Sequence, residues 1–587
     1  MVELIGGSPH SGWWRILLVI AFAATFFLHV FCHSGDDPGY NFLHKASIAP
    51  PISYYDYIVI GGGTAGCPLA ATLSKNADVL VLERGGSPYG NPNITLFSSF
   101  GAAISDLSPT SPSQRFISED GVVNARARVL GGGSCLNAGF YSRAGPVYVQ
   151  DAGWDGQLVK ESYQWVEEVV AFRPEMGGWQ SAVRDGLVEA GVVPYNGFTY
   201  EHIQGTKVGG TLFDKEGKRH TAADLLKYAN PSRIRVLLHA TVHKILFRRK
   251  GLTRPRAHGV IFRDELGNVH RAYLNRGAKN EIILASGALG SPQLLMLSGV
   301  GPAPHLKAHN IEVVLDQPMV GRGMSDNPMN AVYIPSPIPV EVALIQVAGI
   351  TPFGSYIEAA CGENFAAGAP IRADFGMFSP KIGRLSTLPP KKRTPEALAK
   401  AAELMSKLDA RVFQGGFILE KVTGPLSNGH LELRTRNPND NPTVTFNYFS
   451  NPQDLTRCVQ GIQTIEKVIN SRAFSKYKYK GMTFQTLLNL TAQAPVNLLP
   501  HHPNVSTSFE QFCKDTVMTI WHYHGGCQVG RVVDSDYKVM GIDALRVVDG
   551  STFLASPGTN PQATVMMLGR YMGVKILRER LAHREHQ

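Results

Sequence analysis

One short stretch of the chain decides the fold class: residues 57–66, which read YIVIGGGTAG. Residues 57–60 are an apolar run typical of a buried parallel strand, and a glycine-rich turn follows at once. We expect Gly61 to make the tight turn, Gly63 to let backbone amides approach a pyrophosphate, and Gly66 to bring the next helix against the strand. The stretch therefore predicts a strand–turn–helix unit that binds a dinucleotide.

The chain beyond this turn has the pattern that such a unit needs. A helix is predicted at 67–74 and a second strand at 78–82, and Glu83 follows that strand. Glu83 lies 22 residues after Gly61 (83 − 61 = 22), where a carboxylate accepts hydrogen bonds from ribose hydroxyls. The predicted contacts in this unit are Gly61, Gly63, Thr64, Ala65, Gly66 and Glu83. This pattern alone does not distinguish NAD from FAD.

Composition limits the classes of protein that the chain can belong to. It has 587 residues, of which 44% are hydrophobic and 18% charged, with a net charge of +10. These values exclude a disordered chain and a protein with many membrane spans. The basic clusters at 248–250 and 391–393 are short, so we expect no nucleic-acid partner.

The N-terminus predicts entry into the secretory pathway. Residues 16–28 read ILLVIAFAATFFL and follow Arg15, a length that suits the core of a signal peptide better than a full membrane span. We interpret residues 1–34 as a signal peptide or, alternatively, as an uncleaved hydrophobic anchor. Either interpretation predicts a secreted or secretory-pathway protein, with no other contact with a membrane.

Cysteines and glycosylation motifs fit the same compartment. The chain has seven cysteines, none at metal-ligand spacing, so we expect no metal site. An oxidising compartment favours a disulfide bond, and we assign it to Cys458 and Cys513. Asn93, Asn489 and Asn504 each begin an N-x-[S/T] sequence, which predicts a glycoprotein.

Two further motifs resemble a known family. Residues 128–137 read RVLGGGSCLN and residues 287–301 read GALGSPQLLMLSGVG. With the first turn and a histidine motif near the C-terminus, they resemble the glucose–methanol–choline (GMC) flavoprotein oxidoreductases over about residues 54–573. Residues 521–527 (WHYHGGC) and 556–562 (SPGTNPQ) resemble the plant branch of HOTHEAD-like and mandelonitrile lyase-like proteins.

The resemblance implies that the dinucleotide is FAD. Some relatives attach the flavin through a histidine at the position of Leu136, and leucine cannot make that bond, so we expect dissociable FAD. We expect a helix that Ser291 caps and Pro292 begins, with a role in stabilising the FAD domain rather than in chemistry. The resemblance adds these cofactor contacts: Val129, Gly133, Ser134, Asn137, Val242, Trp521, His522, Asp549, Gly550, Asn560 and Gln562.

His522 and Asn560 are the predicted catalytic residues. An alcohol loses hydride only as its hydroxyl proton leaves, and a neutral imidazole with a pKa near 6–7 suits that proton. Asn560 would hold the alkoxide-like oxygen, although it could serve only as the N-cap of a helix that runs to about Leu581. His524 is expected to lie behind His522.

The chain is expected to be an α/β protein with two discontinuous domains. A Rossmann-like FAD-binding domain with a parallel sheet is predicted from residues 54–153, 205–300 and 515–573. A substrate-binding domain with an antiparallel sheet and helices is predicted from residues 154–204 and 326–502.

The predicted function is an FAD-dependent alcohol dehydrogenase or oxidase. The resemblance implies a small-molecule alcohol as substrate, with a long-chain ω-hydroxy fatty acid as the leading choice, and no motif identifies the electron acceptor. The alternatives are an FAD-containing hydroxynitrile lyase and a non-catalytic flavoprotein. Residues 349–361 are expected to line the pocket. Lyase relatives carry a pocket cysteine where this chain has Glu358 or Ala359, with Cys361 two or three residues on, and this difference argues against the lyase.

Overall fold

The computed structural model describes residues 38–100, 104, 106, 108–362, 415–493 and 497–585. The hydrophobic segment predicted within residues 1–34 lies outside the described residues. Among the residues that are described, no helix is both long and apolar enough to cross a membrane.

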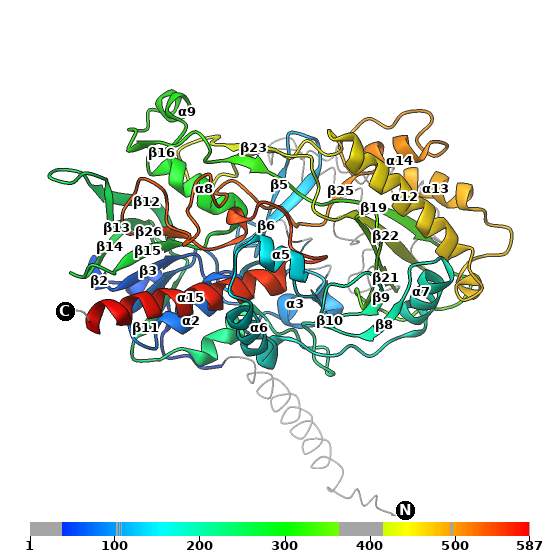
Figure 1. Cartoon of the computed structure of the whole chain (residues 1–587), viewed down its shortest axis with the longest axis horizontal. Helices are drawn as coiled ribbons and strands as arrows, with labels where there is room; N and C mark the ends of the chain where they lie inside the picture. Colours follow the sequence, from blue (N-terminus) through cyan, green and yellow to red (C-terminus); the bar gives the residue numbers. More distant parts are fainter. Residues whose placement is uncertain are drawn as a thin grey trace, which may run out of the picture.

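One of the two large sheets of the molecule is a six-stranded parallel sheet with the strand order β1-β11-β4-β3-β15-β26 (Figure 1). Every adjacent pair is parallel. The strands are β1 (Leu43–Lys45), β3 (Tyr57–Ile60), β4 (Val79–Leu82), β11 (Ile234–Leu238), β15 (Glu281–Leu284) and β26 (Leu545–Val547). The sequence-predicted strands at 57–60 and 78–82 are therefore neighbours in the sheet, and the predicted α/β class is confirmed.

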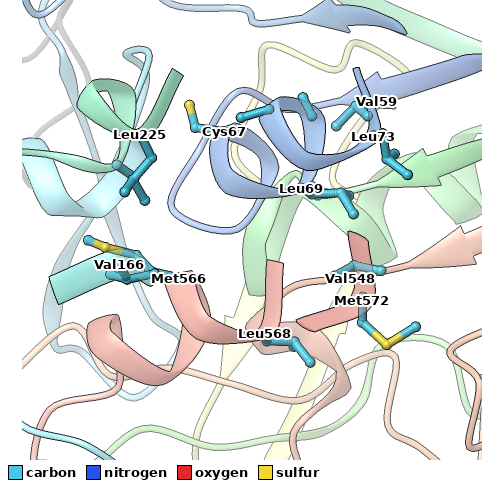
Figure 2. Packing of buried hydrophobic residues seen from close by; sticks show 14 of the residues in the cluster. Val59, Cys67, Leu69, Leu73, Val166, Leu225, Val548, Met566, Leu568 and Met572 are labelled. Carbon is cyan, nitrogen blue, oxygen red and sulfur yellow. The ribbon is translucent and has the colours of Figure 1, made fainter. Parts of the chain in front are cut away.

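Both faces of this sheet are buried, because alternate residues of each strand join different apolar clusters. Tyr57 and Val59 pack with α2 (Gly66–Leu73), α6 (Gly156–Val170) and α15 (Gln562–Glu585). Figure 2 shows Leu69 and Leu73 of the first of these helices opposite Leu568 and Met572 of the last. Ile58 and Ile60 face α8 (Gly287–Leu297) and a four-stranded sheet in the order β12-β13-β14-β2. The strands of this sheet are β2 (Ile52–Tyr55), β12 (Thr241–Arg248), β13 (Arg256–Arg263) and β14 (Val269–Leu274). This double cover explains the unbroken apolar runs of the strands.

The second half of the molecule is built on a seven-stranded sheet, in the order β25-β19-β22-β21-β20-β9-β8, in which only β8 and β9 pair in parallel. Its strands are β8 (Tyr195–Phe198), β9 (Gly205–Val208), β19 (Pro328–Ile334), β20 (Val347–Ile350), β21 (Ser355–Cys361), β22 (Gly416–Val422) and β25 (Met518–Thr519). Its outer face packs on α7 (Gly178–Glu189), α12 (Pro452–Ile469), α13 (Phe484–Ala492) and α14 (Phe509–Asp515) (Figure 1).

Membership of the two sheets crosses the predicted domain boundaries in places. Strand β9, within the segment predicted for FAD binding, belongs to the seven-stranded sheet. Helix α6, within the segment predicted for the substrate domain, packs on α15 and α2 instead. The strands at 429–432 and 443–445 form a separate small sheet with 322–324. The exact domain division stays a prediction.

The structure contains the disulfide bond predicted between Cys458 and Cys513. It joins α12 to α14 on the outer face of the seven-stranded sheet. The cysteines Cys67, Cys135, Cys361 and Cys527 are buried free thiols. The three predicted glycosylation sites, Asn93, Asn489 and Asn504, are all exposed.

Candidate active site and cofactor cleft

A cavity of about 320 Å³ lies at the carboxyl ends of the parallel strands and extends to Ile345 and Ile520, which stand just before β20 and just after β25. Most of the predicted site residues line it, from segments far apart in the sequence. They are Gly61, Gly63, Thr64, Ala65, Glu83, Val129, Gly133, Asn137, Val242, Trp521, His522, Asp549, Gly550, Asn560 and Gln562. Gly66 and Ser134 are the two predicted contacts that do not line it.

The glycine turn has the geometry that the sequence predicted. Gly61 adopts φ +102°, which favours glycine, and a Cβ there would lie 2.5 Å from the carbonyl oxygen of Ala285. A Cβ on Gly66 would lie 1.9 Å from the carbonyl oxygen of Gly61. Gly66 therefore acts by letting α2 pack against the turn, and not by touching the cavity.

Two other glycines leave space in the cavity. A Cβ on Gly63 would meet no atom nearer than 3.8 Å, and a Cβ on Gly133 none nearer than 4.0 Å. Both residues line the cavity, so an added methyl group would fill part of it. Together with the N-terminus of α2, they form a cradle with the shape and exposed amides that suit a pyrophosphate.

Glu83 is buried at the end of β4 and is held by the backbone. Its Oε2 accepts a hydrogen bond from the Gly62 amide at 2.9 Å, and its Oε1 accepts one from the Gly85 amide at 2.7 Å. Burial raises the pKa of Glu83, and the hydrogen bond from Gly85 and the charge of Arg84 oppose that rise. The remaining lone pairs of the fixed carboxylate are suited to ribose hydroxyls.

The second glycine loop is closed by Ser134, whose side chain acts within the protein. Its Oγ donates to the Gly131 carbonyl at 2.7 Å and accepts from the Ala222 amide at 2.9 Å. Asn137, in contrast, faces the cavity and donates to Oε1 of Gln562 at 2.7 Å, although 425 residues separate the two. This bond fixes the loop against the start of α15.

Helix α8 differs from the prediction for residues 287–301. It begins at Gly287, so Ser291 and Pro292 lie inside it and not at its start. Ser291 donates to Oδ2 of Asp549 at 2.5 Å, and Asp549 also accepts from the Gly287 amide at 2.9 Å. The first turn of α8 lines the cavity, so this segment contacts the cofactor cleft as well as stabilising the domain.

Two arginines in the cleft were missed by the sequence analysis. Arg84 and Arg126 line the cavity near Glu83 and Val242. Burial lowers the pKa of Arg84 to about 10, and that of Arg126 well below its usual value. Arg84 directly follows Glu83 in the sequence, so the dinucleotide motif could have indicated that it lies in the cleft. Arg126 lies on β6 (Val123–Ala127), outside any motif.

His522 is 8% exposed, lines the cavity, and is oriented by a tyrosine. The hydroxyl of Tyr356 lies 3.3 Å from its Nδ1. Burial, the charge of Lys421 and His524 all lower the pKa of His522 well below its ordinary value. The imidazole is therefore neutral at pH 7, but its pKa lies below the value near 6–7 that the sequence suggested.

His524 lies behind His522, as predicted. Its Nδ1 is 2.9 Å from the carbonyl oxygen of His522, and it does not line the cavity. Burial lowers the pKa of His524 to about 4. Trp521 has a left-handed backbone with φ +60°, which lets the chain turn so that residues 521–523 all border the cavity.

Asn560 stands just before α15 and is 8% exposed on the cavity wall. Its Oδ1 is buried and, among the described residues, has no hydrogen-bond partner. Its side chain interacts with the buried carboxyl of Glu358 and opposes the rise that burial causes in the pKa of that carboxyl. The helix begins at Gln562, one residue later than an N-cap at Asn560 implies, and ends at Glu585. His522 and Asn560 thus border one cavity from separate segments.

Residues 349–361 were predicted to line the pocket, but none of them lines the cavity. They form parts of β20 and β21, which lie behind it, and Tyr356 reaches His522 from there. Cys361 joins the apolar cluster against α7 and α12, and its Sγ contacts the Glu341 carbonyl oxygen at 3.0 Å. The thiol is therefore on the face of the sheet opposite the site.

The fold and the cleft define a dinucleotide-binding flavoprotein oxidoreductase. Two family models described as GMC oxidoreductase match the chain, over residues 55–329 and 425–569. The chain belongs to the GMC oxidoreductase family. Its cofactor is FAD, and it is an FAD-dependent oxidoreductase.

Relatives with several activities resemble the chain over most of its length. Protein HOTHEAD of Arabidopsis thaliana is 56% identical, covering 91% of this chain and 89% of the relative. The (R)-mandelonitrile lyase-like protein of the same plant is 47% identical, covering 93% and 94%. Sinalpyl alcohol oxidase Nec3 of Nesocodon mauritianus is 43% identical, covering 92% and 91%.

Solved structures share the fold. A formate oxidase from Aspergillus oryzae RIB40 matches with a TM-score of 0.69 and 19% identity, covering 90% of this chain and 99% of that one. At this identity the likeness concerns the fold alone.

Proposed function

We propose that this protein oxidises a primary alcohol, with His522 as the base that takes the hydroxyl proton and Asn560 as the donor to the resulting oxygen. The observation that carries the proposal is that both side chains border the cavity that contains the dinucleotide cradle. Bound FAD supplies the hydride acceptor.

The state of His522 supports the role of base. A buried, neutral imidazole can accept a proton, and the contact between Tyr356 and Nδ1 leaves Nε2 for the substrate. The side-chain amide of Asn560 carries two N–H groups, so one can turn toward Glu358 and the other toward the substrate. A hydrogen bond from that group would stabilise negative charge on the alcohol oxygen as the proton leaves.

The substrate that we propose is a long-chain ω-hydroxy fatty acid. Next to Trp521 lies an apolar cluster, of which Ile104 and Ile520 line the cavity. Such a wall favours an aliphatic or aromatic alcohol over a sugar. HOTHEAD, the relative with 56% identity, supports this choice through the family resemblance, and the alcohol oxidase Nec3 supports alcohol oxidation in general.

We also propose that the protein is secreted and glycosylated. The apolar run at 16–28, the disulfide bond and the three exposed sequons support this localisation.

The decisive experiment is anaerobic mixing of the purified holoenzyme with ω-hydroxy fatty acid, aromatic alcohol or mandelonitrile. An alcohol substrate should remove the flavin absorbance at about 450 nm. His522→Ala should slow this by about 10²–10⁴-fold while FAD stays bound. His430→Ala is the control, because His430 lies on the small sheet and does not line the cavity. Equal flavin reduction in His522→Ala and wild type would indicate that His522 is not the base.

A hydroxynitrile lyase is the second candidate, because the (R)-mandelonitrile lyase-like relative is 47% identical. In that case mandelonitrile would release cyanide and the flavin would stay oxidised. The position of Cys361, on the far face of the sheet, argues against a lyase that uses a pocket cysteine. No response to any of the three compounds would favour a non-catalytic flavoprotein.

A further inference from the structure

A buried ion pair stands directly behind the candidate active site. Glu358 on β21 and Lys421 on β22 form a salt bridge, and the side chains of both are 0% exposed. In the strand register Lys421 of β22 lies opposite Tyr356 of β21. Glu358 lies two residues after Tyr356 on β21. Residues at this spacing share one face of a sheet, so all three side chains point to the same side.

That side is the one that faces the cavity. The intervening residues Ile357, Ala359 and Ile418 belong to the apolar cluster on the opposite face. The polar side chains of the inner face contact the two predicted catalytic residues instead. Burial raises the pKa of Glu358, and Lys421, Lys207 and the side chain of Asn560 oppose that rise. Lys421 places its Nζ 5.4 Å from the ring centroid of Tyr356, whose hydroxyl meets His522.

Stability alone does not account for the pair. Removing two charges from water has a large desolvation penalty, and buried ion pairs are often replaced by apolar side chains with no loss of stability. A second cation, Lys207, also lies near Glu358, and burial lowers its pKa to about 7. Apolar side chains at positions 358 and 421 would serve packing alone equally well.

We propose that Glu358 and Lys421 are positioning residues for the alcohol oxidation proposed above: Glu358 orients the amide of Asn560, and Lys421 holds a positive charge near His522. The oriented amide directs its second N–H to the substrate oxygen. The positive charge favours the anionic oxygen and disfavours the imidazolium. The pair therefore sets both the geometry and the charge of the site without touching the substrate.

The test compares wild type with the apolar double variant Glu358→Leu/Lys421→Met and with the isosteric Glu358→Gln. Removing the pair should lower kcat by about 10²-fold, because a displaced Asn560 amide no longer meets the reacting oxygen. KM should change little and the thermal midpoint should not fall. The titratable groups around His522 include Tyr356, Lys421, His524 and Asp326, which faces the His522 backbone and whose pKa burial raises to about 7. Without the charge of Lys421, the acid limb of the kcat/KM profile should move to higher pH.

Glu420→Gln is the matched control. Glu420 is a buried carboxyl adjacent to Lys421, but it faces away from the site and accepts a hydrogen bond from Ser355 at 2.8 Å. This variant should change stability without changing the pH profile. A double variant that is folded and has wild-type kcat and pH profile would overturn the proposal.

A second measurement separates this proposal from the proposed function. The pKa of His522 can be followed by NMR of ¹³C-labelled histidine, without turnover, in wild type and in the double variant. If wild type oxidises no alcohol, the proposed function fails, and the NMR titration still decides the role of the pair. An unchanged pKa of His522 in the double variant would contradict the proposed role of the Glu358–Lys421 pair.

Discussion

His522 is the residue whose surroundings differ most from the expectation for a simple catalytic base. A histidine of ordinary pKa would be half protonated near pH 6.5. Here burial, reinforced by Lys421, keeps the imidazole neutral well below that pH. If His522 is the base that we propose, it is available at physiological pH, and burial and Lys421 disfavour the charge of its conjugate acid.

The pH dependence of turnover follows from this shift. A base with a lowered pKa is in its active, neutral form above that pKa and is lost only as the pH falls through it. We therefore expect kcat/KM to be flat from pH 8 to below about 6.5. Steady-state rates in buffers of constant ionic strength test this. A decline with a midpoint near 7 would show that the imidazole has an ordinary or raised pKa.

Glu83 gives a prediction for cofactor affinity. In Glu83→Gln, the amide replaces one acceptor oxygen by a donor, next to the amides of Gly62 and Gly85, which are also donors. Weakening such charged hydrogen bonds should make the free energy of FAD binding less favourable by about 1.5–3 kcal/mol. This corresponds to a Kd that is roughly 10–100-fold higher. Fluorescence titration of the apoprotein measures it. Unchanged affinity would mean that the carboxylate does not contact the ribose.

At the scale of elements, α8 is bonded to the segment that follows β26, which is far from it in the sequence. Ser291 inside the helix bonds Asp549, which follows β26 at the other end of the sequence. Ser291→Ala should lower the free energy of unfolding by about 1–3 kcal/mol, because it leaves a buried carboxyl short of a donor. It should also speed release of FAD, since Asp549 borders the cavity.

The control for this prediction is Ser471→Ala. Ser471 is also buried and bonds a backbone carbonyl, that of Val468, but it lies at the end of α12. Thermal unfolding and the rate of FAD release are measured for both variants. Equal FAD release in the two would mean that α8 does not hold Asp549 in its cofactor-binding position.

The sequence was most informative where chemistry is encoded in consecutive residues. Strand β3, the glycine turn and Glu83 could be predicted because the turn needs glycines at fixed spacing. The start of α8 could not, because Ser291 and Pro292 resemble an N-terminal cap although the helix begins at Gly287. Residues 349–361, which include Tyr356 and Glu358, were expected in the pocket wall, but their contacts behind the cavity and the part of Lys421 could not be predicted. Strand pairing across long separations, and no local motif, brings these side chains together.

At the scale of the whole molecule, the disulfide bond should stabilise the half that carries the seven-stranded sheet. It closes a loop with a sequence separation of 55, for which chain entropy gives up to about 4 kcal/mol. Cys458→Ala/Cys513→Ala should lower the thermal midpoint and leave the flavin spectrum unchanged, because the bond lies outside the cleft.

Cys361→Ala is the matched variant, since it removes a buried thiol from the same apolar cluster without breaking a crosslink. Calorimetry on the oxidised proteins makes the comparison. If both variants lose the same stability, the effect comes from packing and not from the crosslink.

The cofactor cleft joins the opposite ends of the polypeptide. Its phosphate cradle lies at residues 61–66, whereas β26, Asn560 and α15 come from the last 43 residues (587 − 545 + 1 = 43). A growing chain on the ribosome therefore has the cradle long before it has the edge strand and the helix that complete the cleft. FAD can therefore be enclosed only after residue 560 and the start of α15 have been synthesised, and a product that stops before position 560 lacks a finished active site.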